Sequence, residues 1–274
     1  MRNFQRTIKN SGRLSGIGLH TGKKANITFN PALINHGIKF QRIDLKDKPI
    51  INADVDNVVT VERGTTLSQN NATVATVEHL LAAIVGLQID NILIQIDGEE
   101  IPILDGSSIE FLECLESCEF KDQDAARNYI EISDKIHYKD DENNVEIAVY
   151  PHNNHRITCM VDYNSEVLGS QHHTLNKLSK FKEEISRART FCFLHEIEEL
   201  FNKNLIKGGD LNNAIVIVDK VLDKIKLDEI SKMMGRKKVE VKKEGILNNT
   251  ELKYKNEPAR HKLLDIIGDL ALVG

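Results

Sequence analysis

Two runs in the first half of the chain have the apolar pattern of β-strands. Residues 25–29 (ANITF) alternate between apolar and polar positions, which is typical of a half-buried strand. Residues 91–96 (NILIQI) are mostly apolar and β-branched, and they end at the turn signal Asp97-Gly98. The first half of the chain therefore predicts at least two strands.

Two further runs in this half have the composition of helices. Residues 73–86 (TVATVEHLLAAIVG) are rich in Leu and Ala and predict a helix that ends at Gly86. Residues 107–118 (SSIEFLECLESC) predict a second helix, for which Ser107 or Ser108 is available as the N-cap. Strand and helix signals thus alternate along the first half.

The second half begins after a polar stretch, residues 121–128, which lacks apolar periodicity and is our candidate linker between two domains. Three strands are expected beyond it, at 129–138, 144–151 and 157–163. The charged turn KDDENN would join the first two of these strands.

Residues 191–204 (FCFLHEIEELFNKN) predict a helix that closes at Gly208-Gly209, and a strand is expected at 213–219. The following residues, about 220–248, are charged and rich in Lys. We interpret them as a solvated insertion.

Length, composition and charge narrow the function classes. At about 150 residues per domain, 274 residues favour two domains. A net charge of −5 argues against non-specific nucleic-acid binding, which needs clustered positive charge. The first twelve residues lack the apolar region of a secretory signal, and no run approaches the roughly 20 apolar residues of a membrane span. We therefore expect a cytoplasmic protein without a transmembrane segment.

Cysteines and most histidines give a weak metal signal. The four cysteines form no CxxC pair and are expected to be reduced, mostly buried thiols: Cys114, Cys118, Cys159 and Cys192. Two histidine pairs lie in polar, loop-like segments without a carboxylate at helical spacing, so we expect them at the surface: His152 with His155, and His172 with His173.

Two other segments combine metal ligands with acid–base groups. His261 and Asp265 stand at positions i and i+4, so on a helix they share one face and can bind one ion. His79 could complete a two-His, one-carboxylate set, and the adjacent Glu78 could accept a proton from water. Pairs of this spacing are also common on solvated helix faces, and a Glu-His pair on an apolar helix is often structural. The spacing alone therefore leaves both interpretations open.

Four blocks of sequence that include these residues resemble the UDP-3-O-acyl-N-acetylglucosamine deacetylase family. They are SGIGLHTG at 15–22, TVEHLLAAIVGLQIDNILIQIDGEEIPILDGSS at 76–108, SRARTFCF at 186–193 and NEPARHKLLDIIGDLALVG at 256–274. They occur in the expected order and cover nearly the whole chain. Together they are far more specific than any single motif.

The resemblance implies an α+β fold of two domains, each with helices layered on a small mixed sheet and with the zinc site between them. The N-terminal domain would span residues 1–125 and carry Glu78-His79. The C-terminal domain would span 129–274. It would carry an acyl-passage insert at about 191–214, the Lys-rich insertion at about 220–248, and the His261-x3-Asp265 pair.

The resemblance also implies residue roles. It makes Zn²⁺ the cofactor, with three ligands: His79, His261 and Asp265. Glu78 becomes the general base, Thr190 helps to stabilise the oxyanion, Lys262 lies near the reacting carbonyl and substrate, and Asp269 orients a catalytic histidine. The acyl chain would contact Phe191, Phe193, Leu194 and Ile197, although the sequence alone favours ordinary core packing for these four. His20 and Asp105 also lie in matched blocks, and we assign neither a catalytic role.

The implied function is a zinc-dependent hydrolase that removes the N-acetyl group from UDP-3-O-(3-hydroxyacyl)-N-acetylglucosamine, the committed step of lipid A biosynthesis. The family histidine that protonates the leaving amine has no counterpart before Gly274, so a truncated C-terminal domain with poor turnover is expected. The Lys-rich insertion resembles the subset fused to a C-terminal 3-hydroxyacyl-acyl-carrier-protein dehydratase. Two alternatives are a fragment that binds zinc and acyl-UDP-sugar without efficient turnover, and another zinc amidohydrolase of N-acyl sugars.

Overall fold

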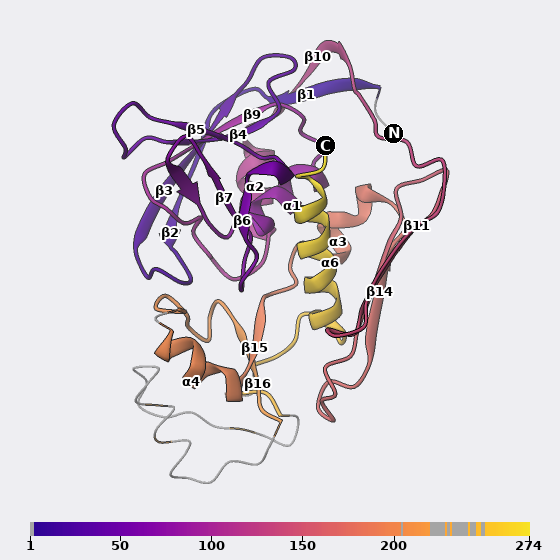
Figure 1. The fold of residues 1–274 in the computed structure, drawn as a ribbon. Coiled ribbons are helices and arrows are strands. Elements are labelled where there is room, and N and C mark those ends of the chain that lie inside the picture. Colours follow the sequence, from indigo (N-terminus) through magenta and orange to yellow (C-terminus); the bar gives the residue numbers. More distant parts are fainter. Residues whose placement is uncertain are drawn as a thin grey trace.

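The structure is a computed structural model that describes residues 3–203, 205–219, 228, 231, 241, 245–247 and 250–274 (Figure 1). It has the α+β architecture predicted from the sequence, with small sheets and short helices. The Lys-rich insertion expected at about 220–248 falls mostly outside the described residues.

A five-stranded sheet forms the centre of the first half. Its strands, in spatial order, are β2 (Gly12–Ile17), β3 (Lys24–Pro31), β9 (Ile92–Ile96), β4 (Ile38–Arg42) and β5 (Ile50–Asn52). β9 pairs antiparallel with β3 and parallel with β4. The strands predicted at 25–29 and 91–96 are thus confirmed as β3 and β9, and their apolar side chains are buried except for the half-buried Leu93.

A three-stranded sheet lies beside it and leads into the first helix. Its strands are β6 (Val58–Thr60), β7 (Thr66–Gln69) and β8 (Ala72–Val74). The short 3-10 helix η1 (Val55–Asn57) directly precedes β6. Helix α1 spans Glu78–Gly86, so the predicted end at Gly86 is confirmed but the predicted start at residue 73 is wrong. Thr76 has a left-handed backbone, with φ 58°, which a helix cannot continue through. The helix therefore starts only after this residue.

Helix α2 (Ile109–Ser117) confirms the second predicted helix. Ser108 occupies the N-cap position but makes no side-chain cap bond. Its Oγ instead donates to the His79 carbonyl oxygen at 2.9 Å. Ser107 Oγ accepts weakly from the Ile109 N–H, at 3.3 Å. Ser108 therefore links α2 to α1.

The stretch predicted as a linker, 121–128, is mostly a strand. β10 (Phe120–Ala126) pairs antiparallel with β1 (Phe4–Ile8). The sequence pattern missed this strand because its polar residues pair with a partner more than a hundred positions away. Its polarity also has a structural use, since Gln123 enters a buried amide cluster.

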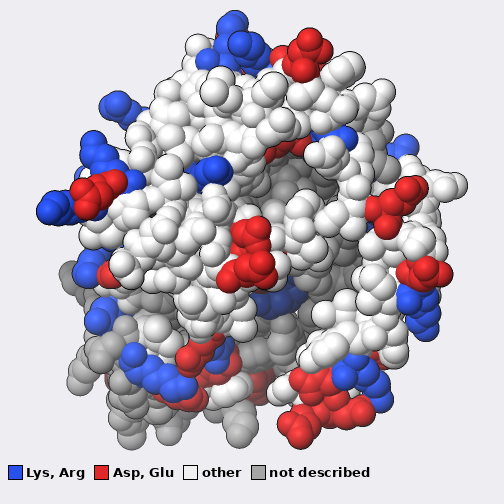
Figure 2. Space-filling model, turned by 45° about the horizontal axis from the view of Figure 1, so that its top comes forward, with Lys and Arg blue, Asp and Glu red and all other residues white. Residues whose placement is uncertain are grey.

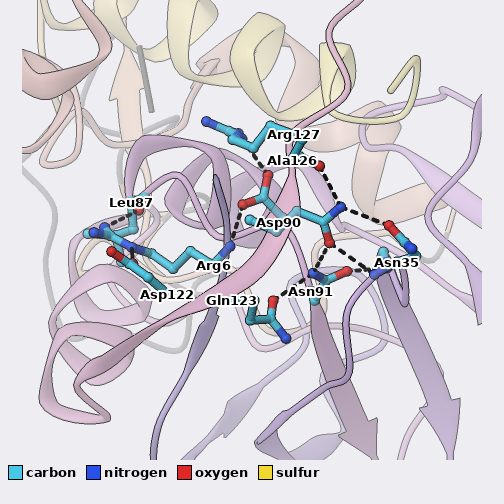
Figure 3. Close-up of polar contacts among 11 residues, drawn as sticks. Arg6, Asn35, Leu87, Asp90, Asn91, Asp122, Gln123, Ala126 and Arg127 are labelled. Atoms are coloured by element: carbon cyan, nitrogen blue, oxygen red, sulfur yellow. Dashed lines mark hydrogen bonds and ion pairs between the residues drawn. The ribbon is translucent and has the colours of Figure 1, made fainter. Parts of the chain in front are cut away.

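We call Gln5, Asn91 and Gln123 the amide cluster (Figure 3). Asn91 is 1% exposed; its Nδ2 donates to Gln5 Oε1 and Gln123 Oε1, each at 2.8 Å. Asn91 Oδ1 accepts from the Gly37 N–H at 2.8 Å. Gln5 Nε2 donates to Asn35 Oδ1 and to the Ala126 carbonyl. The amides thus tie the β1–β10 pair to the central sheet.

The strands of the second half form three separate pairs. They are the β11–β12 hairpin (Ile136–Asp140, Val145–Val149), the β13–β14 pair (Ile157–Val161, Gln171–Leu175) and the parallel β15–β16 pair (Phe191–Phe193, Ile215–Ile217). The strands expected at 129–138, 144–151, 157–163 and 213–219 are present with shorter bounds. β14 was not predicted, and it places His172 and His173 on a strand rather than in a loop.

The helix predicted at 191–204 is partly wrong. Residues 191–193 form β15, and helix α4 begins only at Leu194 (Leu194–Asn202). Phe191 and Phe193 form backbone pairs with Ile215 and Ile217, which a local pattern cannot anticipate. A short helical turn precedes this region, with η2 (Leu178–Lys180) continuing into α3 (Phe181–Glu184).

Helix α6 (Glu257–Leu270) lies between the first-half sheets and the pink strands of the second half in Figure 1. It packs against α1, β13 and β14. One continuous apolar core contains first-half residues such as Leu80 together with Leu263, Leu264 and Ile267 of α6. The proposed division at residues 125–129 stays a prediction, but the packing is continuous across it.

The four cysteines are free thiols, and Cys118 and Cys159 are buried. In the part of the chain that the structure describes, no helix has the length and apolar character that a membrane span requires. On the face in Figure 2, basic and acidic side chains are interspersed around a central hollow, without one continuous basic patch.

Candidate metal centre

The candidate ligands come from the two helices that pack together in the middle of the molecule. Glu78 and His79 open α1, and His261 and Asp265 lie one turn apart on α6. The helices approach so closely that a Cβ on Gly268 would collide with the Glu78 carbonyl oxygen. Glycine at this position therefore allows the two ligand-bearing backbones to meet.

His79, His261 and Asp265 offer three ligand atoms that all lie within 4.8 Å of one another. The two imidazole Nε2 atoms lie 3.5 Å (His79) and 3.4 Å (His261) from Asp265 Oδ1. Ligands at the usual zinc distances around a tetrahedral ion are separated by roughly 3.3–3.6 Å. Asp265 Oδ1 is buried and has no hydrogen-bond partner among the described residues. The set thus has the spacing and the unsatisfied acceptor that a bound cation requires.

Neighbouring groups fix the His261 ring and the backbone of His79. His261 Nδ1 donates to the Ala188 carbonyl oxygen at 3.0 Å, which leaves Nε2 as the lone-pair nitrogen facing Asp265. Burial lowers the pKa of His261 to about 4, so its ring is neutral at pH 7 and able to bind a metal. On α1, the Ser108 hydroxyl holds the His79 carbonyl.

Lys262 lies beside the ligand set. Its Nζ donates to Asp265 Oδ2 at 2.9 Å and lies 5.7 Å from the centre of the Phe191 ring. The Asp265 carboxylate raises the pKa of Lys262 above its usual value, so the ammonium stays charged. This contact occupies one oxygen of Asp265 and leaves the other free for a cation.

Glu78 is a buried carboxyl next to the ligands, 7% exposed. Burial raises its pKa to about 7, while His79 opposes the shift and Asp265 adds to it. Its Oε2 accepts from the Thr65 N–H at 3.0 Å. Thr65 Oγ1 also donates to Asp269 Oδ1 at 2.7 Å, so Thr65 connects the two carboxyls.

Thr190 is positioned by backbone contacts from both sides. Its N–H donates to the Gly106 carbonyl oxygen at 2.7 Å, and its carbonyl accepts from the Ile215 N–H at 2.9 Å. Gly106 has φ 81°, and a Cβ there would collide with the Asn213 carbonyl. Only glycine fits this turn.

A cavity of about 330 Å³ adjoins this region. Its walls are mostly apolar, with three basic or imidazole side chains and one acid: Leu19, His20, Arg63, Thr190, Phe191, Cys192, Ile197, Leu200, Ile206, Lys207, Gly209, Asp210, Ala214 and Val216. Phe191 connects the cavity with the ligands, since its ring centre lies 6.3 Å from that of His261. The cavity therefore begins next to the candidate metal centre.

The four predicted acyl-chain contacts lie in two environments. Phe191 and Ile197 line the cavity. Phe193 instead packs in a cluster with Ile215 and Ile217, and Leu194 lies in a cluster with Ile197.

Of the residues with no predicted role, His20 lines the cavity, and its Nδ1 is buried without a hydrogen-bond partner among the described residues. Asp105 pairs with Lys253 at 2.8 Å and accepts from Ser107. The sequence interpretation missed Thr65 and the Ala188 carbonyl. A backbone oxygen leaves no trace in a sequence motif. Thr65 lies outside every matched block.

Comparison with known proteins gives consistent matches. A family model described as "UDP-3-O-acyl N-acetylglycosamine deacetylase" matches residues 5–232 and 234–274. The chain is 49% identical over 273 residues to a bifunctional enzyme LpxC/FabZ of Chlorobaculum tepidum, covering 98% of this chain and 58% of that protein. It is 40% identical to a UDP-3-O-acyl-N-acetylglucosamine deacetylase of Teredinibacter turnerae, covering 98% and 82%. The chain thus spans less than two thirds of the bifunctional relatives.

Proposed function

Because the chain belongs to the UDP-3-O-acyl N-acetylglycosamine deacetylase family, we propose that it is a zinc-dependent hydrolase. Its substrate would be UDP-3-O-(3-hydroxyacyl)-N-acetylglucosamine, from which it removes the N-acetyl group in lipid A synthesis. The observation that carries the proposal is the buried Asp265 Oδ1, which has no hydrogen-bond partner among the described residues and lies 3.5 and 3.4 Å from the two imidazole Nε2 atoms. A buried carboxyl, Glu78, stands directly beside this set.

His79, His261 and Asp265 would hold the zinc ion and leave one position for water or substrate. When bound, zinc supplies Lewis acidity and makes a nucleophilic water available near pH 7. Glu78 accepts the proton of the attacking water, a role that suits a carboxyl whose pKa is about 7. Thr190 lines the same cavity as Phe191, and the charged Lys262 Nζ lies 5.7 Å from the centre of the Phe191 ring. Both can stabilise the negative charge that develops on the acetyl oxygen.

The acyl chain is assigned to the cavity that starts at Phe191. Each methylene buried there contributes about 0.8 kcal/mol, so a chain that fills the apolar part would improve binding strongly. Arg63 and Lys207 in the same wall are cations that suit the polar part of an acylated UDP-sugar. Phe191 and Ile197 are thus the proposed acyl contacts, and Phe193 and Leu194 support the wall from behind.

Several wider assignments rest on the relatives. The bifunctional names of the Chlorobaculum and Bacteroides thetaiotaomicron relatives support a C-terminal dehydratase partner in the full-length protein. The two-domain division, the cytoplasmic location and the dependence on zinc rather than another divalent ion belong to the proposal as well.

Acetate release from the acylated UDP-sugar tests the proposal. We expect hydrolysis by the zinc-loaded protein, loss of hydrolysis after chelation, and recovery when zinc is restored. Glu78→Ala should lower turnover about 10²–10⁴-fold while zinc stays bound. Equal turnover of wild type and Glu78→Ala would refute the assignment of the base.

UDP-N-acetylglucosamine without the acyl chain serves as the control substrate. It should be hydrolysed far more slowly, because the cavity then stays unused. Equal rates on both substrates would favour a different zinc amidohydrolase of N-acyl sugars.

A further inference from the structure

The segment 188–190 contacts two parts of the chain that build the candidate metal centre. The Ala188 carbonyl accepts from His261 Nδ1 on α6. The Thr190 N–H donates to the Gly106 carbonyl, in the loop whose Ser108 holds His79. Between these two residues stands Arg189, which takes no part in the chemistry proposed above.

Arg189 is anchored by a completely buried carboxylate. Glu257 is 0% exposed, and its Oε1 accepts from the Arg189 N–H at 3.0 Å and from Arg189 Nε at 2.9 Å. Arg189 Nη2 donates to Glu257 Oε2 at 3.2 Å and to the Glu251 carbonyl at 2.8 Å. Glu257 Oε2 also accepts from the Lys253 N–H at 2.6 Å. Two side-chain bonds and one backbone bond therefore fix Arg189 to one carboxylate in a planar, directional arrangement.

The position of Glu257 on α6 links its ion pair with Arg189 to the candidate ligands. Glu257, His261 and Asp265 stand at i, i+4 and i+8 of α6, on one face. The first residue holds Arg189, and the other two are ligands. A fixed Arg189 thus sets where the Ala188 carbonyl meets His261 and where Thr190 lies in the cavity wall next to Phe191.

We propose that Arg189 and Glu257 are positioning residues for the metal centre. Their ion pair fixes segment 188–190, so that the Ala188 carbonyl keeps His261 in the tautomer and orientation that point Nε2 at the ion. The same anchor sets the position of Thr190. The effect on catalysis rests on the proposed function, whereas the effect on His261 follows from these contacts alone.

The test uses Arg189→Lys, which keeps the charge but loses the fork of donors, and Glu257→Gln, which keeps an acceptor oxygen but loses the charge. In metal-free protein labelled with ¹⁵N-histidine, we expect the His261 Nδ1 resonance to shift in both variants. Zinc affinity, measured by competition with a chromogenic chelator, should fall roughly tenfold, the lower end of the effect of outer partners. In the acetate assay kcat should fall while KM stays within about twofold.

Arg42→Lys is the matched control. Arg42 is also buried and makes a two-bond pair with Asp44, at 2.9 and 2.7 Å, outside the metal centre. It should lower stability and leave the His261 resonance and zinc affinity unchanged. Arg189→Lys and Glu257→Gln proteins that behave like this control would overturn the proposal, and so would variants that both fail to fold. A wild type that binds zinc but releases no acetate would refute only the proposed function.

Discussion

Two of the buried polar clusters among the described residues differ in one respect. In the amide cluster of Gln5, Asn91 and Gln123, the amides of Gln5 and Asn91 are paired on both the oxygen and the nitrogen (Figure 3). In the metal centre, His79 Nδ1 and Asp265 Oδ1 are buried without a hydrogen-bond partner among the described residues. Both clusters lie where elements distant in sequence meet.

The difference distinguishes buried polar groups that stabilise the fold from buried polar groups that are available to a ligand. A buried polar group without a partner costs roughly 1–3 kcal/mol, so a fold retains one only where something else compensates. In the amide cluster, hydrogen bonds compensate the cost of burying the amides and hold the β1–β10 pair in place. The candidate metal centre has two such groups in the protein alone, and a cation among its ligands would provide a partner for Asp265 Oδ1. Four experiments address this contrast.

The largest effect is expected from adding zinc. At a thousandfold excess over Kd, a ligand that binds only the folded state stabilises it by about 4 kcal/mol. Thermal unfolding with and without zinc should show this gain in wild type and lose it in His261→Ala. Zinc stabilisation that survives in His261→Ala would place the ion elsewhere.

Glu78→Gln should stabilise the metal-free protein in a pH-dependent way. Folding raises the pKa of Glu78 from 4.5 to about 7, so the folded state favours the protonated carboxyl. The cost of Glu78 is therefore absent below about pH 4.5, grows up to pH 7 and stays constant above it. The variant removes this cost, which we place at about 3 kcal/mol. Urea unfolding in chelator at pH 5 and pH 8 checks it, and a benefit that does not grow with pH would contradict the assignment.

Asn91→Ala should lower the free energy of unfolding by about 2 kcal/mol, because it leaves the Gly37 N–H and the side-chain amide oxygen Oε1 of Gln123 without their partner. Zinc affinity should not change, since the amide cluster shares no contact with the ligands. Denaturant unfolding and a zinc titration of the same sample separate the two outcomes. A loss of zinc affinity would show that the two clusters are coupled.

The smallest effect is expected at Ser108, which holds the His79 carbonyl. Ser108→Ala should cost about 1 kcal/mol of stability, the usual contribution of one hydrogen bond. It should weaken zinc binding less than Arg189→Lys does, because it affects the backbone of α1 rather than an imidazole. Parallel zinc titrations of the two variants rank these contacts.

Local patterns predicted those parts of the fold that depend on local burial. The alternation at 25–29 and the apolar run at 91–96 became β3 and β9, because each buries one or both faces in the same core. The polar stretch at 121–126 was misinterpreted, because its strand pairing depends on β1. Residues 191–193 were assigned to a helix for the same reason, since their partner strand lies at 215–217.

The candidate site divides in the same way. The i, i+4 spacing of His261 and Asp265 predicted a shared helix face, and α6 has that face. The approach of His79 to them depends on Gly268, whose importance no spacing reveals. The Ala188 carbonyl was equally invisible, because its role comes from backbone placement rather than residue type. The metal identity and the catalytic roles rest on the family resemblance.

The contact between Gly268 and the Glu78 backbone has a kinetic consequence. Residues 78 and 268, far apart in the sequence, must meet before the ligands exist as a set, and such long-range closure is slow in folding. We expect the candidate metal site to be complete only on the native side of the rate-limiting barrier, so that a bound ion acts mainly on the native state. Zinc should accordingly slow unfolding and leave the refolding rate almost unchanged. The ion would then extend the lifetime of the folded protein without accelerating its folding.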